Sequence, residues 1–352
     1  MKFPFIKNNR GYIGIAFNDN GVTVGQCEWS HGEFRNAKSK RIDIVPSELT
    51  ADDWQSCISE IGLAGSVCTI TLPPSMTHDQ ILRLPEMSGQ ELQKVASWEL
   101  ADRLGVDHAS LHTDVVRLGV GGDVLAVAID NEIIEWILDP IYKSGMRPSI
   151  VEPQCSAVAR MFSMLHRRQS DKAQVRSVFD FGESESAYMI LAGDCIVFYK
   201  HLTYNGNALI EAIETHTSVT RDQAKKMLYD SRLEGADPAI FKAVHDATRS
   251  ICEEIAMDVM KCNRHYGVTS RGPLSSRIII TGSAGWNHHL SSVFSKNCNQ
   301  EVVPDSSEPH VHVLPNEIVT TNGWHIALGA SLAKITTVNQ RRRSDPKYSE
   351  VA

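Results

Sequence analysis

The sequence has no excess of positive charge. Its 35 lysine and arginine residues stand against 42 aspartate and glutamate residues, which gives a net charge of −7 at pH 7. Proteins that bind nucleic acid normally present a basic surface that neutralises the phosphates. The charge balance therefore predicts that this chain has no nucleic-acid partner.

Long hydrophobic runs are absent as well. No segment approaches the roughly 18 consecutive apolar residues of a membrane-spanning helix. Residues 1–7 hold no apolar stretch of the length found in signal peptides. The eight cysteines are scattered and form no Cys-x-x-Cys pair, which favours reduced thiols over a disulfide framework. We expect a cytoplasmic protein with no direct membrane span.

The length and composition indicate a folded protein with more than one structural unit. The 352 residues correspond to two or three domains of about 150 residues each. A strand–turn–strand pattern near residue 18 recurs near residue 182, which predicts a repeat at the scale of a domain. The predicted units are a first domain at 1–165 with an inserted α+β subdomain at about 76–150, a second domain at 170–340 and a polar tail at 341–352.

The inserted segment has the pattern of a small α+β unit. Ser88 and Glu91 form a capping-box pair that opens a helix, and Gly105 is placed to end it. The apolar residues between them recur at helical spacing. The expected elements of this unit are strands at 77–84, 109–118 and 123–129, helices at 88–105 and 130–145, and a closing strand that ends at residue 153. Outside it we expect strands at 40–45, 66–72 and 277–280, and helices at 51–61, 238–266 and 323–335.

Three turns of mostly small or polar residues are the phosphate-binding candidates of this sequence. They lie at 18–21, 182–186 and 282–285, each directly after a predicted strand. Small residues let backbone N–H groups approach an anion closely. The sequence has neither the P-loop motif nor a Gly-x-Gly-x-x-Gly that opens a βαβ unit. Each turn alone is typical of an ordinary surface turn.

The histidines do not indicate a metal site. His288, His289, His310 and His312 have no acidic or cysteine partner at a spacing typical of metal ligands. We therefore expect these side chains at the surface.

The order of the predicted elements resembles that of the actin-like ATPases, and within them the PilM family of type IV pilus assembly proteins, which is related to the division protein FtsA. The resemblance covers about 12–334. Its most specific parts are the segment 82–104 with Trp98-Glu99, the segment 125–153 that ends in Val151-Glu152-Pro153, the second hairpin at 178–192, and the Ala-Leu-Gly-x-x-Leu helix at 324–332. It implies an α/β, actin-like (ribonuclease H-like) fold of two domains with a cleft between them and an inserted small α+β subdomain.

The resemblance also implies a site for ATP and Mg²⁺ in the cleft, with Asp180 as a metal ligand. In the family the first hairpin reads Gly-Ile-Asp-Ile-Gly-Ser. Here Ala16 stands in place of the aspartate, Asn18 in place of the second glycine, and Thr23 in place of a later lysine. We therefore expect weak or lost ATP binding, no efficient hydrolysis and no catalytic residue. The candidate nucleotide-binding residues are Asn18, Asp19, Asn20, Gly21, Asp180, Gly182, Glu183, Ser184, Ser186, Gly282, Ser283 and Ala284.

The resemblance favours an interaction protein. PilM-like proteins bind the short cytoplasmic N-terminal peptide of the bitopic membrane protein PilN. They act with other pilus assembly proteins on the cytoplasmic face of the inner membrane. The resemblance implies that such a peptide docks in a groove between the first subdomain and the inserted unit, lined here by 82–104 and 130–141. The system served would be a type IV pilus or a related secretion pseudopilus.

The alternative function is that of a small-molecule kinase or ATPase of the same superfamily. Such an enzyme needs an aspartate as general base and an intact first hairpin. Ala16 argues against it. Turnover of nucleotide in the presence of candidate sugars or acids distinguishes the two functions.

Overall fold

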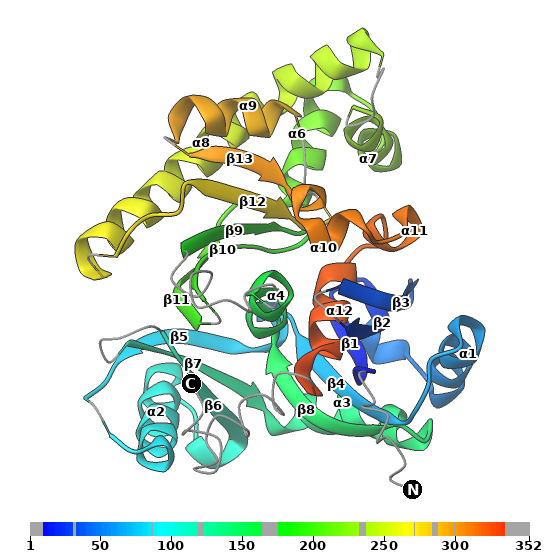
Figure 1. Ribbon diagram of the computed structural model, residues 1–352, viewed down its shortest axis with the longest axis vertical. Helices are drawn as coiled ribbons and strands as arrows, with labels where there is room; N and C mark the ends of the chain where they lie inside the picture. Colours follow the sequence, from blue (N-terminus) through cyan, green and yellow to red (C-terminus); the bar gives the residue numbers. More distant parts are fainter. Residues whose placement is uncertain are drawn as a thin grey trace, which may run out of the picture.

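The computed structural model describes residues 10–30, 33–85, 87–118, 123–163, 175–193, 195–231, 237–270, 272–283, 288–298 and 300–334. Two five-stranded sheets dominate these residues, one from each half of the chain, and a three-stranded sheet lies beside the first (Figure 1). The second half stands above the first in this view. The predicted turn at 119–122, the residues 284–287 and the tail at 341–352 lie outside the described residues.

The first sheet is built around the predicted hairpin. Its strand order is β3-β2-β1-β4-β8, and Asn18 pairs with Gly21 across the turn between β1 and β2. The strands are β1 (Ile13–Asn18), β2 (Gly21–Ser30), β3 (Glu33–Ile42), β4 (Val67–Leu72) and β8 (Arg147–Pro153). The strand expected at 40–45 is wrong in its bounds, because β3 starts at Glu33 and pairs with β2 from there on. Its mostly polar residues hide the alternation that marks a strand.

The second sheet repeats the topology of the first. Its order is β11-β10-β9-β12-β13, with an antiparallel meander followed by two parallel strands, as in the first sheet. The strands are β9 (Val175–Phe181), β10 (Ser186–Ala192), β11 (Cys195–Leu202), β12 (Arg277–Thr281) and β13 (Glu301–Pro304). The predicted repeat between the two halves of the chain is therefore confirmed.

The third sheet, together with α2, forms a separate layer with its own core. Its strands are β5 (His78–Arg83), β6 (Leu111–Arg117) and β7 (Asp123–Asp130), in the order β5-β7-β6. Helix α2 begins after Ser88, whose side chain and that of Glu91 make the predicted reciprocal bonds, and it ends at Gly105 in the left-handed conformation. Of the segment predicted as inserted, α3 packs into the core of the first sheet and β8 pairs with β4. The domain boundaries themselves stay predictions.

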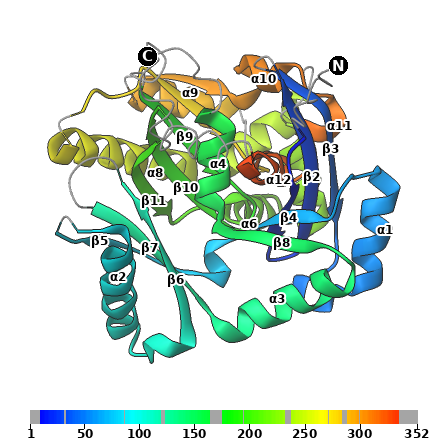
Figure 2. The ribbon, with the colours of Figure 1, turned by 60° about the horizontal axis from the view of Figure 1, so that its bottom comes forward.

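Helices α4 and α12 join the two halves. They pack on each other between the two large sheets (Figure 2), and every residue of α12 is buried. The hydrophobic cluster around them includes Ala16 of β1, Val178 of β9 and Ile279 of β12. The helices are α1 (Ala51–Ile61), α2 (Gly89–Leu104), α3 (Asn131–Lys143), α4 (Gln154–Ser163), α6 (Gly206–Thr217), α7 (Arg221–Asp230), α8 (Pro238–Ser270), α9 (His288–Asn297), α10 (Pro309–His312), α11 (Asn316–Val319) and α12 (Trp324–Ser331).

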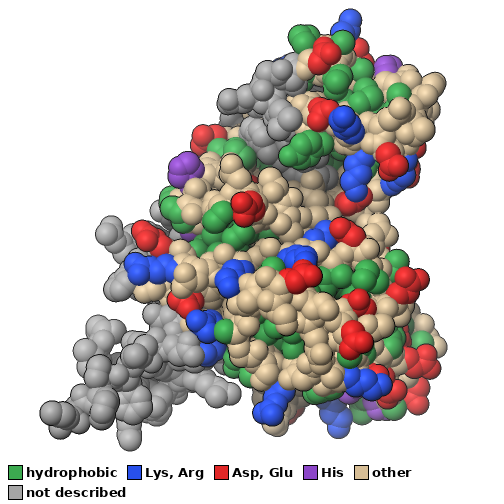
Figure 3. Space-filling model, turned by 90° about the vertical axis from the view of Figure 1, so that its right-hand side faces the viewer, with side chains coloured by type: hydrophobic (Ala, Val, Ile, Leu, Met, Phe, Trp, Pro, Cys, Tyr) green, Lys and Arg blue, Asp and Glu red, His purple; other side chains and the backbone are tan. Residues whose placement is uncertain are grey.

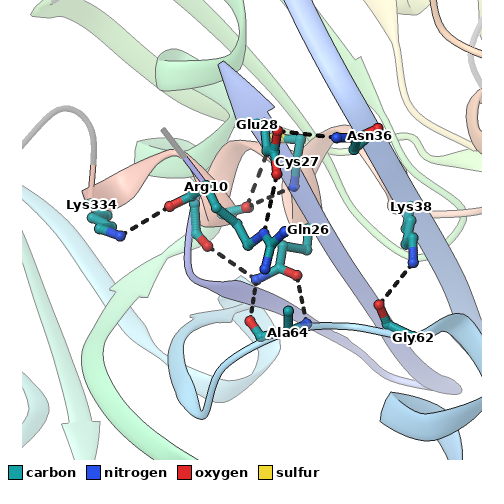
Figure 4. A network of polar contacts seen from close by, with 11 residues as sticks. Arg10, Gln26, Cys27, Glu28, Asn36, Lys38, Gly62, Ala64 and Lys334 are labelled. Carbon is teal, nitrogen blue, oxygen red and sulfur yellow. Dashed lines mark hydrogen bonds and ion pairs between the residues drawn. The ribbon is translucent and has the colours of Figure 1, made fainter. Parts of the chain in front are cut away.

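A polar network fastens the outer end of the first sheet (Figure 4). The side-chain amide of the buried Gln26 donates to the carbonyls of Gly11 and Ala64, at 3.1 and 2.8 Å, and accepts from the Ala64 N–H at 2.9 Å. Lys38 donates to the Gly62 carbonyl at 2.8 Å. Lys334, after α12, donates to the Arg10 carbonyl at 3.1 Å. The loop after α1 and the end of the chain's last helix are thus held to β1 and β2.

One predicted surface histidine is buried. His310 of α10 lies between the rings of Phe34 and Phe162, with centroid distances of 5.8 and 6.1 Å. His312 is exposed as expected. The side chains of His288 and His289 lie outside the described residues.

Candidate functional site

Two adjoining cavities lie where the halves of the chain meet. The smaller one has a volume of about 40 Å³, which is room for a few water molecules. The larger one has a volume of about 1050 Å³, which is ample for a small-molecule ligand. Five residues line both cavities: Asn20, Arg41, Glu183, Ser283 and Asn322.

The structure brings the three predicted turns together around these cavities. Of the candidate residues, those that line the smaller cavity are Asn18, Asp19, Asn20, Asp180, Gly182, Glu183, Ser184 and Ser283. Gly282 lines the larger cavity, and Ser186 lines a separate cavity of about 30 Å³ next to the smaller one. Gly21 lies in the first turn at the start of β2. Ala284 lies outside the described residues.

Asp180, at the inner end of β9, is bound to a histidine that the sequence analysis did not single out. The Nε2 atom of His325 lies 3.0 Å from Asp180 Oδ1, and the His325 side chain is only 2% exposed. The neighbouring Gly282 has φ +98°, and a Cβ there would lie 2.8 Å from Asp180 Oδ1 and 2.5 Å from the Phe181 carbonyl oxygen. Glycine at 282 is therefore required for Asp180 to keep this position.

The first hairpin offers no second metal ligand opposite Asp180. Ala16 is fully buried and carries no carboxylate, and Asp19 accepts a hydrogen bond from the Ser75 hydroxyl at 2.7 Å. Mg²⁺ binds through oxygen ligands in near-octahedral geometry. Within the described ranges, no three His, Cys, Asp or Glu side chains gather where they could hold a metal ion. Since Asp180 is also engaged by His325, the residues of the site do not fit the Mg²⁺ ion predicted there.

Glu185, which the sequence analysis passed over, crosses from the second half of the chain to the first. Its Oε1 atom accepts a hydrogen bond from the Ser75 backbone N–H at 2.7 Å. Burial, and next the nearby charge of Asp19, raise the pKa of the Glu185 carboxyl to about 7. Glu185 therefore holds its proton up to about neutral pH.

The larger cavity combines basic and apolar side chains. Lys225 of α7 forms an ion pair with Glu183 at 2.8 Å, and Arg41 of β3 forms one with Asp43 at 2.6 Å. The apolar lining residues are Ile210, Leu228, Tyr229, Val319 and Trp324. The side of the molecule that carries α1, α7 and α11 mixes basic and acidic side chains (Figure 3).

Arg41 occupies a position that the sequence pattern did not mark. It pairs directly with Thr23 across β2 and β3, so the two side chains share one face of the sheet. Thr23 is the place where the family resemblance predicted a lysine. The structure therefore offers a cation from the neighbouring strand, on the same face as the missing one.

No protein-family model matches the chain, and no curated protein matches it in sequence. Among solved structures, the chain is similar to one of the "PilM-PilN type IV pilus biogenesis complex", with 16% sequence identity and a TM-score of 0.68; the match covers 92% of this chain and 98% of that chain. It is also similar to ethanolamine utilization protein EutJ from Carboxydothermus hydrogenoformans, with 13% identity, a TM-score of 0.50 and coverage of 93% and 90%. The chain thus has the two-domain α/β fold of the actin-like ATPases, with a cleft between the domains and an inserted small sheet.

Proposed function

We propose that this chain is a PilM-like scaffold of a type IV pilus or a related secretion assembly. It binds the short cytoplasmic peptide of a PilN-like bitopic membrane protein, acts with other assembly proteins, and is held by its partner at the cytoplasmic face of the inner membrane. The observation that carries the proposal is the match to nearly the whole length of a chain from a PilM–PilN complex. No helix in the described part of the chain is long and apolar enough to cross a bilayer, so we assign the attachment to a partner.

The cleft supports a scaffold rather than an enzyme. Enzymatic phosphoryl transfer depends on charge neutralisation by metal ions and on a positioned nucleophile. Here the first hairpin carries Ala16 where a carboxylate would organise the ion, and Asp180 is bound to His325. These two features argue against the alternative of a small-molecule kinase and against efficient ATP hydrolysis.

The outward face of α2 carries the apolar side chains that we assign to peptide docking. Leu92, Ala96 and Leu100 face inward and are buried against the third sheet. Trp98 is 53% exposed, and Val95 is exposed beside it. The Lys94 ammonium lies 5.1 Å from the centre of the Trp98 ring, which holds the ring in place. An exposed tryptophan on a rigid helix is the type of residue that dominates binding energy at interfaces.

The inserted unit and the first domain meet next to this face. The Asn131 side chain, at the start of α3, donates to the Ala109 carbonyl at 3.0 Å. This bond connects the two segments predicted to line the docking groove, 82–104 and 130–141, through the loop that follows α2. We place the partner peptide along these segments.

The test is calorimetric titration of the purified chain with a synthetic peptide that spans the cytoplasmic N-terminus of the PilN-like protein encoded in the same genome. Trp98→Ala should weaken binding by about tenfold or more. Phe241→Ala, an exposed aromatic of α8 in the other half of the chain, serves as the matched control and should bind as the wild type does. A wild-type chain that does not bind the peptide, or a Trp98→Ala variant with unchanged affinity, would overturn the proposal.

A further inference from the structure

We propose that the larger cavity binds a phosphorylated small molecule without a divalent metal ion, and that Arg41 contacts its phosphate. This inference goes beyond the scaffold function and does not depend on it. It follows from the distribution of charge between the two cavities and from one unsatisfied donor.

The smaller cavity is unsuited to a phosphate group. It is lined by four carboxyl side chains: Asp19, Asp180, Glu183 and Glu185. Phosphate oxygens among these groups would be repelled unless a cation lay between them, and the residues do not fit Mg²⁺. A phosphate in this cleft is therefore excluded from the turn that holds Asp180.

The larger cavity carries basic side chains from both halves of the chain. They are Lys40 and Arg41 of β3 and Lys225 and Lys226 of α7. Its acidic residues are Asp43, Glu183, Asp222 and Asp305. Of these, Asp43 and Glu183 are paired with Arg41 and Lys225, and burial raises the pKa of the Asp305 carboxyl. Among the described residues, Lys226 has no ion-pair partner.

Arg41 has a donor that no protein atom uses. Its Nε donates to Asp43, but the buried Nη1 has no hydrogen-bond partner among the residues that the structure describes. Leaving a buried charged donor unmet costs free energy, and a ligand oxygen would satisfy it. A guanidinium presents parallel N–H groups that match two phosphate oxygens. Phosphate is therefore the ligand chemistry that this group fits.

The backbone of the first turn makes room for the guanidinium. A Cβ on Gly21 would lie 3.0 Å from Arg41 Nη2, so glycine at this position lets the guanidinium lie close to the turn. From there Arg41 lines both cavities. A phosphate bound to it would stand at the mouth of the smaller cavity, with the organic part of the ligand against the apolar wall formed by Ile210, Tyr229 and Trp324.

The test is calorimetric titration of the full chain with ADP as the probe, once in EDTA and once in excess Mg²⁺. We expect saturable binding in EDTA, with an affinity within about threefold of that in Mg²⁺. Arg41→Ala should weaken binding at least tenfold. Arg41→Lys, which keeps the charge but loses the fork, should give an intermediate loss. Arg35→Ala, an exposed arginine of the same strand that lines neither cavity, should bind like the wild type.

Three results would overturn the inference. They are the absence of ADP binding in EDTA, binding that requires Mg²⁺, and an Arg41→Ala variant with unchanged affinity. The melting temperatures of Arg41→Ala and Arg41→Lys separate a loss of binding from a loss of folding, because a folded Arg41→Lys chain still reports on the contact. The partner peptide titrated into the same preparations reports on the scaffold function separately, so that either proposal can fail alone.

Discussion

Glu152 and Arg160 form a buried ion pair whose removal should destabilise the junction of the two halves. The two guanidinium nitrogens of Arg160 donate to the two carboxylate oxygens of Glu152 at 2.8 and 2.6 Å. The side chains are only 13% and 11% exposed. Arg160 also donates to the Gly329 carbonyl at 2.9 Å. The pair therefore ties β8 to α4 and α12, the two helices between the large sheets.

Glu152→Gln removes the negative charge and leaves Arg160 buried without a counter-charge. Breaking a buried pair in this way costs about 3–5 kcal/mol. We expect a loss of about 3 kcal/mol in the free energy of unfolding, measured by urea denaturation followed by tryptophan fluorescence. The matched control is Glu99→Gln on α2, whose pair with Arg103 is 45% and 46% exposed and should contribute about 0.5 kcal/mol.

The double variant Glu152→Met with Arg160→Met separates the two components of this effect. Replacing both partners of a buried pair with apolar residues is often close to neutral, so the double variant should recover most of the stability lost in Glu152→Gln. The reasoning would be refuted if Glu152→Gln lost no more stability than Glu99→Gln.

Two further predictions concern the cleft. The Glu185 carboxyl has a pKa of about 7 in the folded chain against an ordinary value of 4.5, so its contribution to stability is present below pH 4.5 and is lost as the pH rises through 7. Glu185→Gln should therefore raise the melting temperature more at pH 8 than at pH 5, and an equal change at both pH values would contradict this. Gly282→Ala should destabilise the chain by more than Gly65→Ala, because both glycines have positive φ but only position 282 has backbone atoms that a Cβ would meet. Thermal melts of the two variants test this, and equal losses would show that the space around position 282 is not restricted.

The local signals in the sequence predicted the elements that carry their own caps. Helix α1 spans 51–61 as expected, and α2 starts at the Ser88–Glu91 box and ends at Gly105. The hairpin around 18–21 and the recurrence of its pattern near 182 sufficed to predict two similar halves. These features depend on residues that lie within a few positions of one another, which is why one sequence reveals them.

The long-range features of the site left no such signal. His325 meets Asp180 across 145 positions of the chain, and nothing in the residues around either one marks the pair. Arg41 enters the site through the register of β3 on β2, and the polar sequence of β3 concealed where that strand begins. His310 carries a polar ring, yet aromatic residues from two distant segments enclose it. In each case the packing of the whole fold sets the environment of the side chain.

The most direct test of the scaffold function is hydrogen–deuterium exchange of the chain with and without the cytoplasmic peptide of its PilN-like partner. The account predicts slower exchange on peptide binding in residues 82–104 and 130–141, with no change along α8. Protection confined to other segments, such as the exposed face of α8 that carries Met257, Met260 and Val268, would contradict it. The absence of any protection at saturating peptide would contradict it equally.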